Sequence, residues 1–590
     1  EHADAFIIDS LPGAGDQAFE IAAQDGKISL RGNNGVAIAS ALYYYIKEYA
    51  HGQITWNGTN LNFPESLPLP EQPVRKESPY EYRYYLNYCT FNYSMSWWDW
   101  ERWEKEIDWM ALHGINMPLA ITGEEYIWDE VYKSYGFTDE DLKDFFSGPS
   151  YFSWFWMGNL DGWGGPLPQS WKESHRDLQK ILKRSRELGM KPVLPAFTGH
   201  VPASFKKFFP DADLKKTNWG NDFGDTYILD AEDPLFAEIG KRFLEKQEEV
   251  FGTDHFYTAD TFNENEPPSD DPKYLGELSE KIFEGMKAAD PEATWVMQGW
   301  LFYSHKDFWK TPQIKGLLST VPDDRMIILD LATEIEPVWK QTEAFYGKQW
   351  IWNMLHNFGG NISMFGRIET VAEQPALALN DSTSGNLKGI GLTMEAIEQN
   401  PVLYELMTDN TWRDTPIELK SWLKNYTRNR YGAVNDSILE AWDILVATAY
   451  NGTTIRDGAE SIIAARPTFE GYRRWARTKM NYDPLDLLPA WDLFIGARDR
   501  FKDSDGFAYD LVDLSRQVLA NYALPVQQQM RIAYENNDKE AFKKHSEELL
   551  TLISDLDRLL ATRKDFLLGP WIADARSWGT TSEEKALYER

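Results

Sequence analysis

The stretch Thr258-Ala-Asp-Thr-Phe-Asn-Glu-Asn-Glu-Pro-Pro268 is the part of the sequence that decides the fold. It continues the β-prone run His255-Phe-Tyr257, so the sequence predicts a short strand that stops at Glu264, just before two prolines that block regular pairing. In α/β barrels, the chemistry lies at the C-terminal ends of buried parallel strands. The alternative is that Asp260, Glu264 and Glu266 form a solvated loop, as most acidic loops do.

The pattern around this stretch is a repeated strand and helix. Short strands of the buried type are predicted at Arg83–Cys89, Ile115–Ile121, Lys191–Phe197, His255–Thr261, Thr294–Trp300, Met326–Leu331, Trp350–Leu355 and Gly389–Met394. The clearest intervening helix is Ser96–His113, where Ser96 and Asp99 resemble a capping box and Gly114 can close the end. The predicted fold class is therefore α/β, with a central TIM-type (β/α)8 barrel over residues 77–408.

Two smaller domains are predicted beside the barrel. Residues 1–76 form an α/β domain with strands at Ala5–Ile8, Phe19–Ile21 and Lys27–Leu30, a helix at Gly35–Tyr49, edge strands at Ile54–Trp56 and Leu61–Phe63, and a proline-rich linker at 64–73. Residues 409–590 form an all-α domain with helices at Leu419–Tyr431, Ser437–Tyr450, Phe507–Asn536 and Lys539–Arg563. Pro525 should kink or break the third of these helices.

The composition of the chain indicates which kinds of molecule it can bind. The 590 residues carry a net charge of −32, which repels nucleic acid and anionic membrane surfaces and favours a neutral substrate. The only cysteine is Cys89, and the nine histidines show no metal-ligand spacing, so no metal or cofactor is predicted. The 25 tryptophans, 29 tyrosines and 31 phenylalanines suit a sugar-binding protein, because pyranose rings present flat C–H faces. The oligomeric state stays open.

Polar side chains follow most of the predicted strands, and in a barrel these positions meet at one mouth. They include Asn87, His200, Asn263, Glu264, Gln298, His356, Asn357 and Glu395. Glu264 and Glu395 are the candidate catalytic pair, because glycoside hydrolysis needs one protonated and one ionised carboxyl group. The alternative for Glu395 is a structural position at the N-terminus of a helix spanning Ala396–Met407.

Other candidates at the mouth each have a structural alternative. The aromatic candidates are Trp154, Trp163, Trp219, Trp300 and Trp352, which are either sugar platforms or packing residues. His356 is a substrate-binding candidate, although a histidine in this position is more often a structural hydrogen bonder. Cys89 would ordinarily be a small buried apolar residue.

Several runs make the chain similar to a known family. They are Trp97-Trp-Asp-Trp-Glu-Arg-Trp-Glu104, Ile107-Asp-Trp-Met-Ala-Leu112, Pro192-Val-Leu-Pro-Ala-Phe197, Ala259-Asp-Thr-Phe-Asn-Glu264, Gln298-Gly-Trp-Leu-Phe302 and Met354-Leu-His-Asn-Phe-Gly-Gly360. The chain resembles the α-N-acetylglucosaminidases of glycoside hydrolase family 89 over nearly its whole length. Lysosomal members of that family continue beyond the position that matches Arg590.

The resemblance implies an exo-acting, retaining enzyme that releases terminal α-linked N-acetylglucosamine. By motif, Glu264 matches the general acid/base and Glu395 the nucleophile. Asn87, Cys89, Tyr93, Trp154, Trp219, Asn263, Trp300 and Trp352 match positions that line the pocket. The surroundings of Glu395, Leu392-Thr-Met-Glu-Ala-Ile397, are less similar to the family than the other runs.

Two other functions stay open at this point. One is a substrate-assisted hexosaminidase, in which the acetamide attacks; Asp260 would then support the site, although it is not adjacent to Glu264. The other is a non-catalytic carbohydrate-binding protein, whose barrel would be expected to lack one carboxylate. The shortage of cysteine favours an exported bacterial protein, periplasmic or extracellular, over a lysosomal one.

Overall fold

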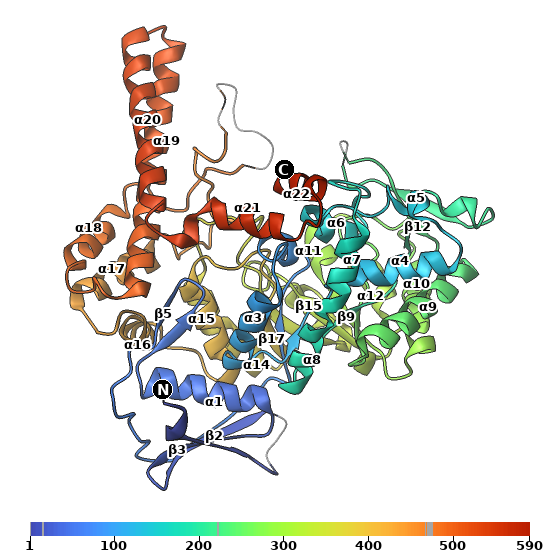
Figure 1. The fold of residues 1–590 in the computed structure, drawn as a ribbon, viewed down its shortest axis with the longest axis horizontal. Helices are drawn as coiled ribbons and strands as arrows, with labels where there is room; N and C mark the ends of the chain where they lie inside the picture. The colour runs from blue at the N-terminus through green and yellow to red at the C-terminus, as the bar shows by residue number, and fades with distance from the viewer. Residues whose placement is uncertain (1, 14–16, 221–222, 467, 469–475) are drawn as a thin grey trace.

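A closed parallel barrel is the centre of the molecule (Figure 1). The structure is a computed structural model that describes residues 2–13, 17–220, 223–466, 468 and 476–590. The barrel strands are β7 Tyr82–Tyr85, β8 Met117–Pro118, β9 Leu194–Pro195, β13 Phe256–Thr258, β14 Thr294–Gln298, β15 Met326–Asp330, β16 Gln349–Met354 and β17 Asn386–Leu392. Their order is β8-β7-β17-β16-β15-β14-β13-β9, and a parallel bridge between Leu119 and Val193 joins the two edges. Every predicted barrel strand is confirmed, although most are shorter than predicted.

Each barrel strand is followed by at least one helix, as the (β/α)8 prediction requires. The helices are α2 Thr90–Tyr93 and α3 Trp100–Leu112 after β7; α4 Glu124–Ser134, α5 Asp139–Leu142, α6 Phe152–Trp156, α7 Gln169–Arg176 and α8 Lys180–Glu187 after β8; α9 Pro234–Phe251 after β9; α10 Pro272–Ala289 after β13; α11 Trp300–Ser304 and α12 Thr311–Leu318 after β14; α13 Val338–Gln341 after β15; α14 Ile368–Asn380 after β16; and α15 Pro401–Asp409 after β17. A small sheet of β10 His200–Val201, β12 Thr226–Leu229 and β11 Leu214–Thr217 lies between β9 and α9.

Local sequence sets the start of several helices. The helices α9 and α10 each begin with proline in the first turn, and the preceding Asp233 and Asp271 accept backbone N–H bonds as caps. The predicted start of α3 at Ser96 is wrong. Asp99 caps α3 by accepting from the N–H of Arg102, whereas the Ser96 hydroxyl donates to the carbonyl of Asn92.

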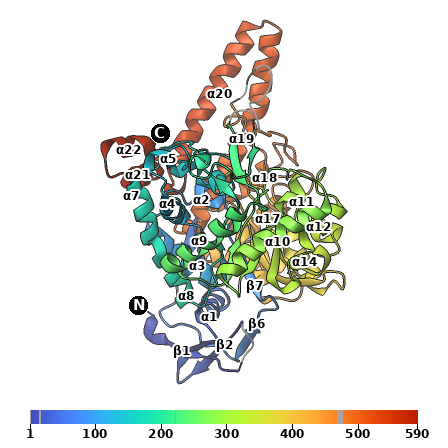
Figure 2. The same ribbon diagram turned by 90° about the vertical axis from the view of Figure 1, so that its right-hand side faces the viewer.

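The N-terminal domain packs one helix on a four-stranded sheet (Figure 2). Its strands are β1 Phe6–Ser10, β2 Ala18–Gln24, β3 Lys27–Gly32 and β6 Val74–Glu77, with α1 Gly35–Glu48 and the hairpin β4 Gln53–Thr55 and β5 Gly58–Asn60. The predicted strand Leu61–Phe63 is wrong, because the tight turn after β4 pairs the chain again at Gly58 and the hairpin ends at Asn60.

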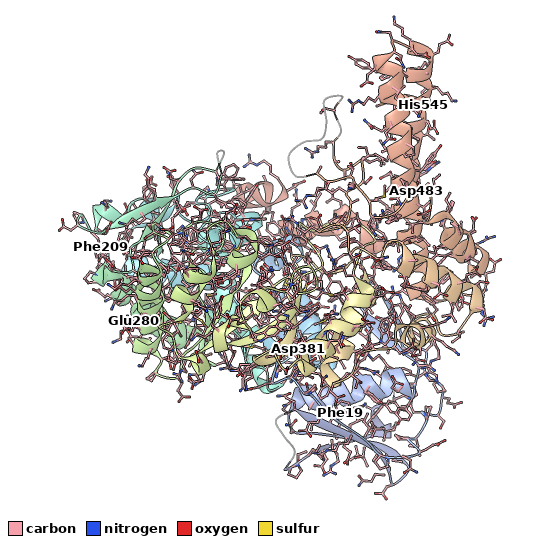
Figure 3. The ribbon with its side chains drawn as sticks, turned by 180° about the vertical axis from the view of Figure 1, so that it is seen from behind. Phe19, Phe209, Glu280, Asp381, Asp483 and His545 are labelled. Atoms are coloured by element: carbon pink, nitrogen blue, oxygen red, sulfur yellow. The ribbon has the colours of Figure 1, made fainter. Side chains whose placement is uncertain are left out.

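The C-terminal region is helical, as predicted. Its helices are α16 Leu419–Tyr431, α17 Asp436–Ala447, α18 Leu488–Ala497, α19 Asp505–Glu535, α20 Lys539–Leu560, α21 Leu568–Ser577 and α22 Ser582–Glu589. The pair α19 and α20 projects from the body, with His545 in its outer part and Phe19 at the opposite side of the molecule (Figures 1 and 3). Pro525 does not break α19, which runs unbroken through it. Within the described residues, no helix is both long and apolar enough to cross a bilayer.

A buried charged cluster joins the N-terminal domain to the barrel. Lys47 of α1 pairs with Glu405 of α15 at 2.9 Å and also with Asp409. Glu405 accepts a further bond from the hydroxyl of Tyr43 at 2.9 Å, and its Oε2 lies 3.3 Å from Nε2 of His113, which follows α3. The cluster therefore fixes α1 and α3 against the end of the barrel that carries α15.

Candidate active site

Glu264 lies in the loop after β13 and is held by two tryptophans. Nε1 of Trp219 donates to its Oε2 at 2.6 Å, and Nε1 of Trp300 donates to its Oε1 at 2.9 Å. Bonds of this kind to a carboxylate are short and strong because they are charge-assisted. The prediction that β13 continues to Glu264 is wrong, since the strand ends at Thr258 and the loop carries the carboxyl group to the indoles.

Asp260 anchors the start of the same loop through hydrogen bonds. Its carboxylate accepts bonds from the N–H and the side-chain amide of Gln298 at 2.9 and 3.0 Å, and from the hydroxyl of Thr258 at 3.0 Å. Burial raises the pKa of Asp260 to about 6, although those donors act against it. Glu266 is exposed. The three acidic residues therefore do not form a uniformly solvated loop.

Glu395 lies just past β17 and is half-buried. The N–H of Gly359 donates to its Oε2 at 2.6 Å, and its own N–H donates to the carbonyl of Asn357 at 3.0 Å. Gly359 can present its N–H in this way because it adopts φ +62°, a conformation that glycine takes without strain. The alternative that Glu395 begins a helix is wrong, because α15 starts only at Pro401.

The charge of Glu264 acts on the carboxyl group of Glu395. Burial raises the pKa of Glu395 to about 7, and the negative charges of Glu264 and Asp457 raise it as well. The Gly359 N–H and the positive charge of Arg456 act in the opposite direction. The chain thus brings together two carboxyl groups that are 131 positions apart (395 − 264).

Cys89 and Tyr93 belong to the same cluster. Burial, then Glu395 and Glu264, raise the pKa of the Cys89 thiol, so the thiol stays protonated. Burial and Glu395 likewise raise the pKa of Tyr93, whose side chain is 38% exposed and can donate a hydrogen bond. Asn87 joins neighbouring strand ends: its side-chain amide donates to the carbonyl of Thr393 at 3.0 Å, and its side-chain oxygen accepts from the N–H of Cys89 at 3.0 Å.

Aromatic rings continue outward from both carboxylates. Tyr93 meets Trp154 at 5.6 Å between ring centroids with the planes at 90°, and Trp154 lies 6.5 Å from Trp219. On the other side, Trp300 lies 6.3 Å from Phe358. These half-buried rings cluster around the two carboxyl groups, a combination of aromatic and acidic side chains that suits a pyranose ring.

Three predicted site residues have their side chains engaged elsewhere. Trp352 lies within β16, is 1% exposed and belongs to the hydrophobic core, so protein covers its ring. The side-chain amide of Asn263 contacts Sδ of Met157 at 3.1 Å. His356 is buried with its ring packed near Phe365 and Tyr404, and burial, then Arg367, lowers its pKa to about 3, so the ring is neutral.

Three residues of the site were not predicted as members of it. Gly359 and Phe358 lie in the run Met354–Gly360, and the paired glycines were a signal that the backbone adopts a special conformation there. Arg456 comes from the C-terminal domain, and no local pattern points to it. Within the ranges that the structure describes, no three histidine, cysteine or acidic side chains gather in a way that could hold a metal ion.

Known proteins share this architecture. Residues 83–414 match the family description "Alpha-N-acetylglucosaminidase tim-barrel domain", and residues 1–69 and 422–590 match its N-terminal and C-terminal domains. The chain is 39% identical over 573 residues to the human protein called alpha-N-acetylglucosaminidase, covering 96% of this chain and 76% of the human one.

Solved structures agree with this match. A family 89 glycoside hydrolase from Clostridium perfringens, in complex with 2-acetamido-1,2-dideoxynojirmycin, is 38% identical with a TM-score of 0.93, covering 100% of this chain and 67% of that one. The same values hold for a variant of the Clostridium enzyme with two glutamates replaced by glutamine, in complex with its substrate GlcNAc-α-1,4-galactose. The chain therefore belongs to the α-N-acetylglucosaminidases, glycoside hydrolase family 89.

Proposed function

We propose that the chain is an exo-acting, retaining hydrolase that releases terminal α-linked N-acetylglucosamine by double displacement. The observation that carries this proposal is the coupled pair Glu264 and Glu395, each bound by N–H donors at the same barrel mouth. Glu264 protonates the glycosidic oxygen while Glu395 attacks the anomeric carbon. Water then attacks the glycosyl-enzyme, Glu264 takes the proton of that water, and Glu395 leaves.

The aromatic walls determine what the site accepts. We propose that Tyr93, Trp154, Trp219 and Trp300 contact the terminal sugar, with Asn87 and Cys89 at the base of the pocket. Asn263 is proposed to bind the 2-acetamido group, while Trp352 and His356 would support the pocket from the core. The complex of the Clostridium enzyme makes GlcNAc-α-1,4-galactose the first substrate to test.

One observation favours the reverse assignment of the two roles. The indoles of Trp219 and Trp300 donate to both oxygens of Glu264, so both oxygens act as acceptors. The pKa of Glu395, at about 7, favours a proton there in the free enzyme. In the reverse assignment Glu395 would be the acid and Glu264 the nucleophile.

Azide rescue separates the two assignments. In the variant Glu395→Gly, an aryl α-N-acetylglucosaminide should be turned over at a small residual rate, and azide should restore cleavage with a β-azide product. In Glu264→Ala, azide should intercept the glycosyl-enzyme and give the α-azide. An α-azide from Glu395→Gly together with a β-azide from Glu264→Ala would establish the reverse assignment.

The matched control for both variants is Glu266→Gln, an exposed carboxylate on the loop that carries Glu264; its activity should be unchanged. Substantial activity in Glu395→Gly without azide, combined with inactive Asp260→Asn, would instead favour substrate-assisted chemistry. Binding of the sugar by calorimetry with no release of product by the wild-type chain would favour a non-catalytic protein.

We also propose that the chain acts outside the bacterial cytoplasm. The single cysteine supports this, because the chain needs no disulfide to fold in either compartment. Fractionation of the source cell, with activity recovered in the periplasmic or extracellular fraction, tests it.

A further inference from the structure

We propose that Arg456, which comes from the C-terminal helical domain, is a positioning residue that places a positive charge near Glu395 and so favours the ionised form that attacks. The inference rests on the proposed function, because it takes Glu395 as the nucleophile. Its basis is a line of contacts that runs from the loop after α17 to the Glu395 carboxylate.

The first contacts bind two loops together. The loop at 450–459, after α17, lies against the loop at 357–367 that follows β16. Arg367 donates to the carbonyls of Ile455 and Arg456, and the side-chain amide of Asn361 donates to the carbonyl of Gly458 at 2.7 Å. The N–H of Gly452 donates to the carbonyl of Gly366 at 2.8 Å. The helical domain thus reaches the barrel mouth through a loop held at several points.

The next contacts lead to the catalytic carboxylates. The Arg456 guanidinium lies 4.7 Å from the centroid of the Phe358 ring, and the residue after Phe358 is Gly359, whose N–H donates to Glu395. The same Phe358 ring lies 6.3 Å from Trp300, the donor to Glu264. Phe358 therefore connects the cation with the groups that hold both carboxylates. An arginine suits this place because its planar guanidinium stacks on a ring and stays charged at every working pH.

Arg456 makes few strong contacts that would compete for its charge. Its ion pair with the neighbouring Asp457 is long, at 3.4 Å, and its side chain is 39% exposed. Its buried Nε has no hydrogen-bond partner among the residues that the structure describes. Its charge lowers the pKa of Glu395 while the charge of Asp457 raises it. The two neighbours therefore act on the nucleophile with opposite signs, so variants of each should shift its titration in opposite directions.

The experiment tests the opposite effects of the Arg456 and Asp457 charges on the titration of Glu395. The pH dependence of kcat/KM for an aryl α-N-acetylglucosaminide is measured for the wild type, Arg456→Gln, Arg456→Lys and Asp457→Asn. Because the nucleophile must be ionised, Arg456→Gln should move the acidic limb upward by about half a pH unit, a loss of roughly three-fold below that limb. Asp457→Asn should move the limb downward, and Arg456→Lys should keep it near the wild-type position.

The control is Arg477→Gln. Arg477 pairs with Asp457 at 3.3 Å, whereas Arg456 is among the largest influences on the Glu395 pKa, so this variant should move the limb less than Arg456→Gln. An acidic limb that stays in place in both Arg456→Gln and Asp457→Asn, with wild-type folding, would overturn the inference alone. A shift of the basic limb in Arg456→Gln would mean that Glu395 is the acid, and would overturn the proposed roles and the inference with them.

Discussion

Glu395 and Glu405 lie close in sequence, are both at least half-buried, and experience opposite environments. Burial alone would raise the pKa of Glu405, but the Lys47 ammonium and the bonds from His113 and Lys47 outweigh it and hold that pKa below its ordinary value. Glu395 accepts one backbone N–H, faces the charge of Glu264, and its pKa rises to about 7. Both carboxyl groups are removed from water, so the difference between their pKa values comes from the charges and hydrogen-bond donors around them.

The comparison separates a carboxylate that stabilises the fold from one that, under the proposed function, takes part in the reaction. Removing a partner from a fully paired buried group leaves a charge with nothing to balance it. A group with few partners costs stability when ionised, and perturbed groups of this kind gather at functional sites. Four experiments test whether Glu395 and Glu405 divide in this way.

The largest effect should come from Glu395→Gln. An amide cannot attack the anomeric carbon, so kcat should fall about 10⁴-fold or more. Folding should be retained, since no buried partner loses its charge. Steady-state kinetics and circular dichroism of the same preparation measure both. If the variant is inactive because it is unfolded, Glu395 stabilises the fold in the same way as Glu405, and the comparison fails.

Glu405→Gln should have the complementary result. Loss of the carboxylate leaves Lys47 with Asp409 alone and should cost about 3 kcal/mol of stability, with kcat nearly unchanged. Denaturant midpoints followed by tryptophan fluorescence measure the loss. The matched control is Glu48→Gln, an exposed carboxylate next to Lys47, which should shift the midpoint little. An equal shift in both variants would mean that the cluster at Glu405 contributes no special stability.

Trp300→Phe should affect activity more than stability. It removes one N–H donor from the Glu264 carboxylate and keeps most of the ring, so kcat/KM should fall about 10-fold, the effect of about 1.5 kcal/mol. Trp309→Phe is the control, because Nε1 of Trp309 has no hydrogen-bond partner within the described part of the chain. If both variants keep full activity, the donor from Trp300 does not position Glu264.

The smallest effect should be a pH-dependent difference between the wild type and Glu395→Gln. The folded pKa of Glu395, at about 7, lies above its unfolded value, so its contribution to stability is complete below about pH 4.5 and is lost as the pH rises through 7. The glutamine variant does not titrate. It should match the wild type at pH 4.5 and be about 1 to 2 kcal/mol more stable at pH 8, with solvent screening included. Midpoints that differ equally at both pH values would contradict the raised pKa.

Much of the fold follows from local pattern. The eight barrel strands are predictable because short buried-type runs alternate with helices, and α1, α16 and α20 because their apolar residues recur at helical spacing. Element ends were predicted less well. The pattern places the helix start at Ser96 where Asp99 caps it, and the predicted strand before Glu264 runs past the end of β13 at Thr258. Several nearby residues could serve equally at each end, and only the packed chain selects one.

The sequence alone determined that Glu264 and Glu395 follow buried strands, since strand periodicity and motif are local properties of the chain. Only the tertiary structure decided how these carboxylates are held. The indoles of Trp219 and Trp300 meet on Glu264, while the N–H of Gly359 and the charge of Arg456 from the helical domain both act to lower the pKa of Glu395. The physical reason is that a pKa and a hydrogen bond depend on distances of a few ångströms between segments that lie far apart in the chain.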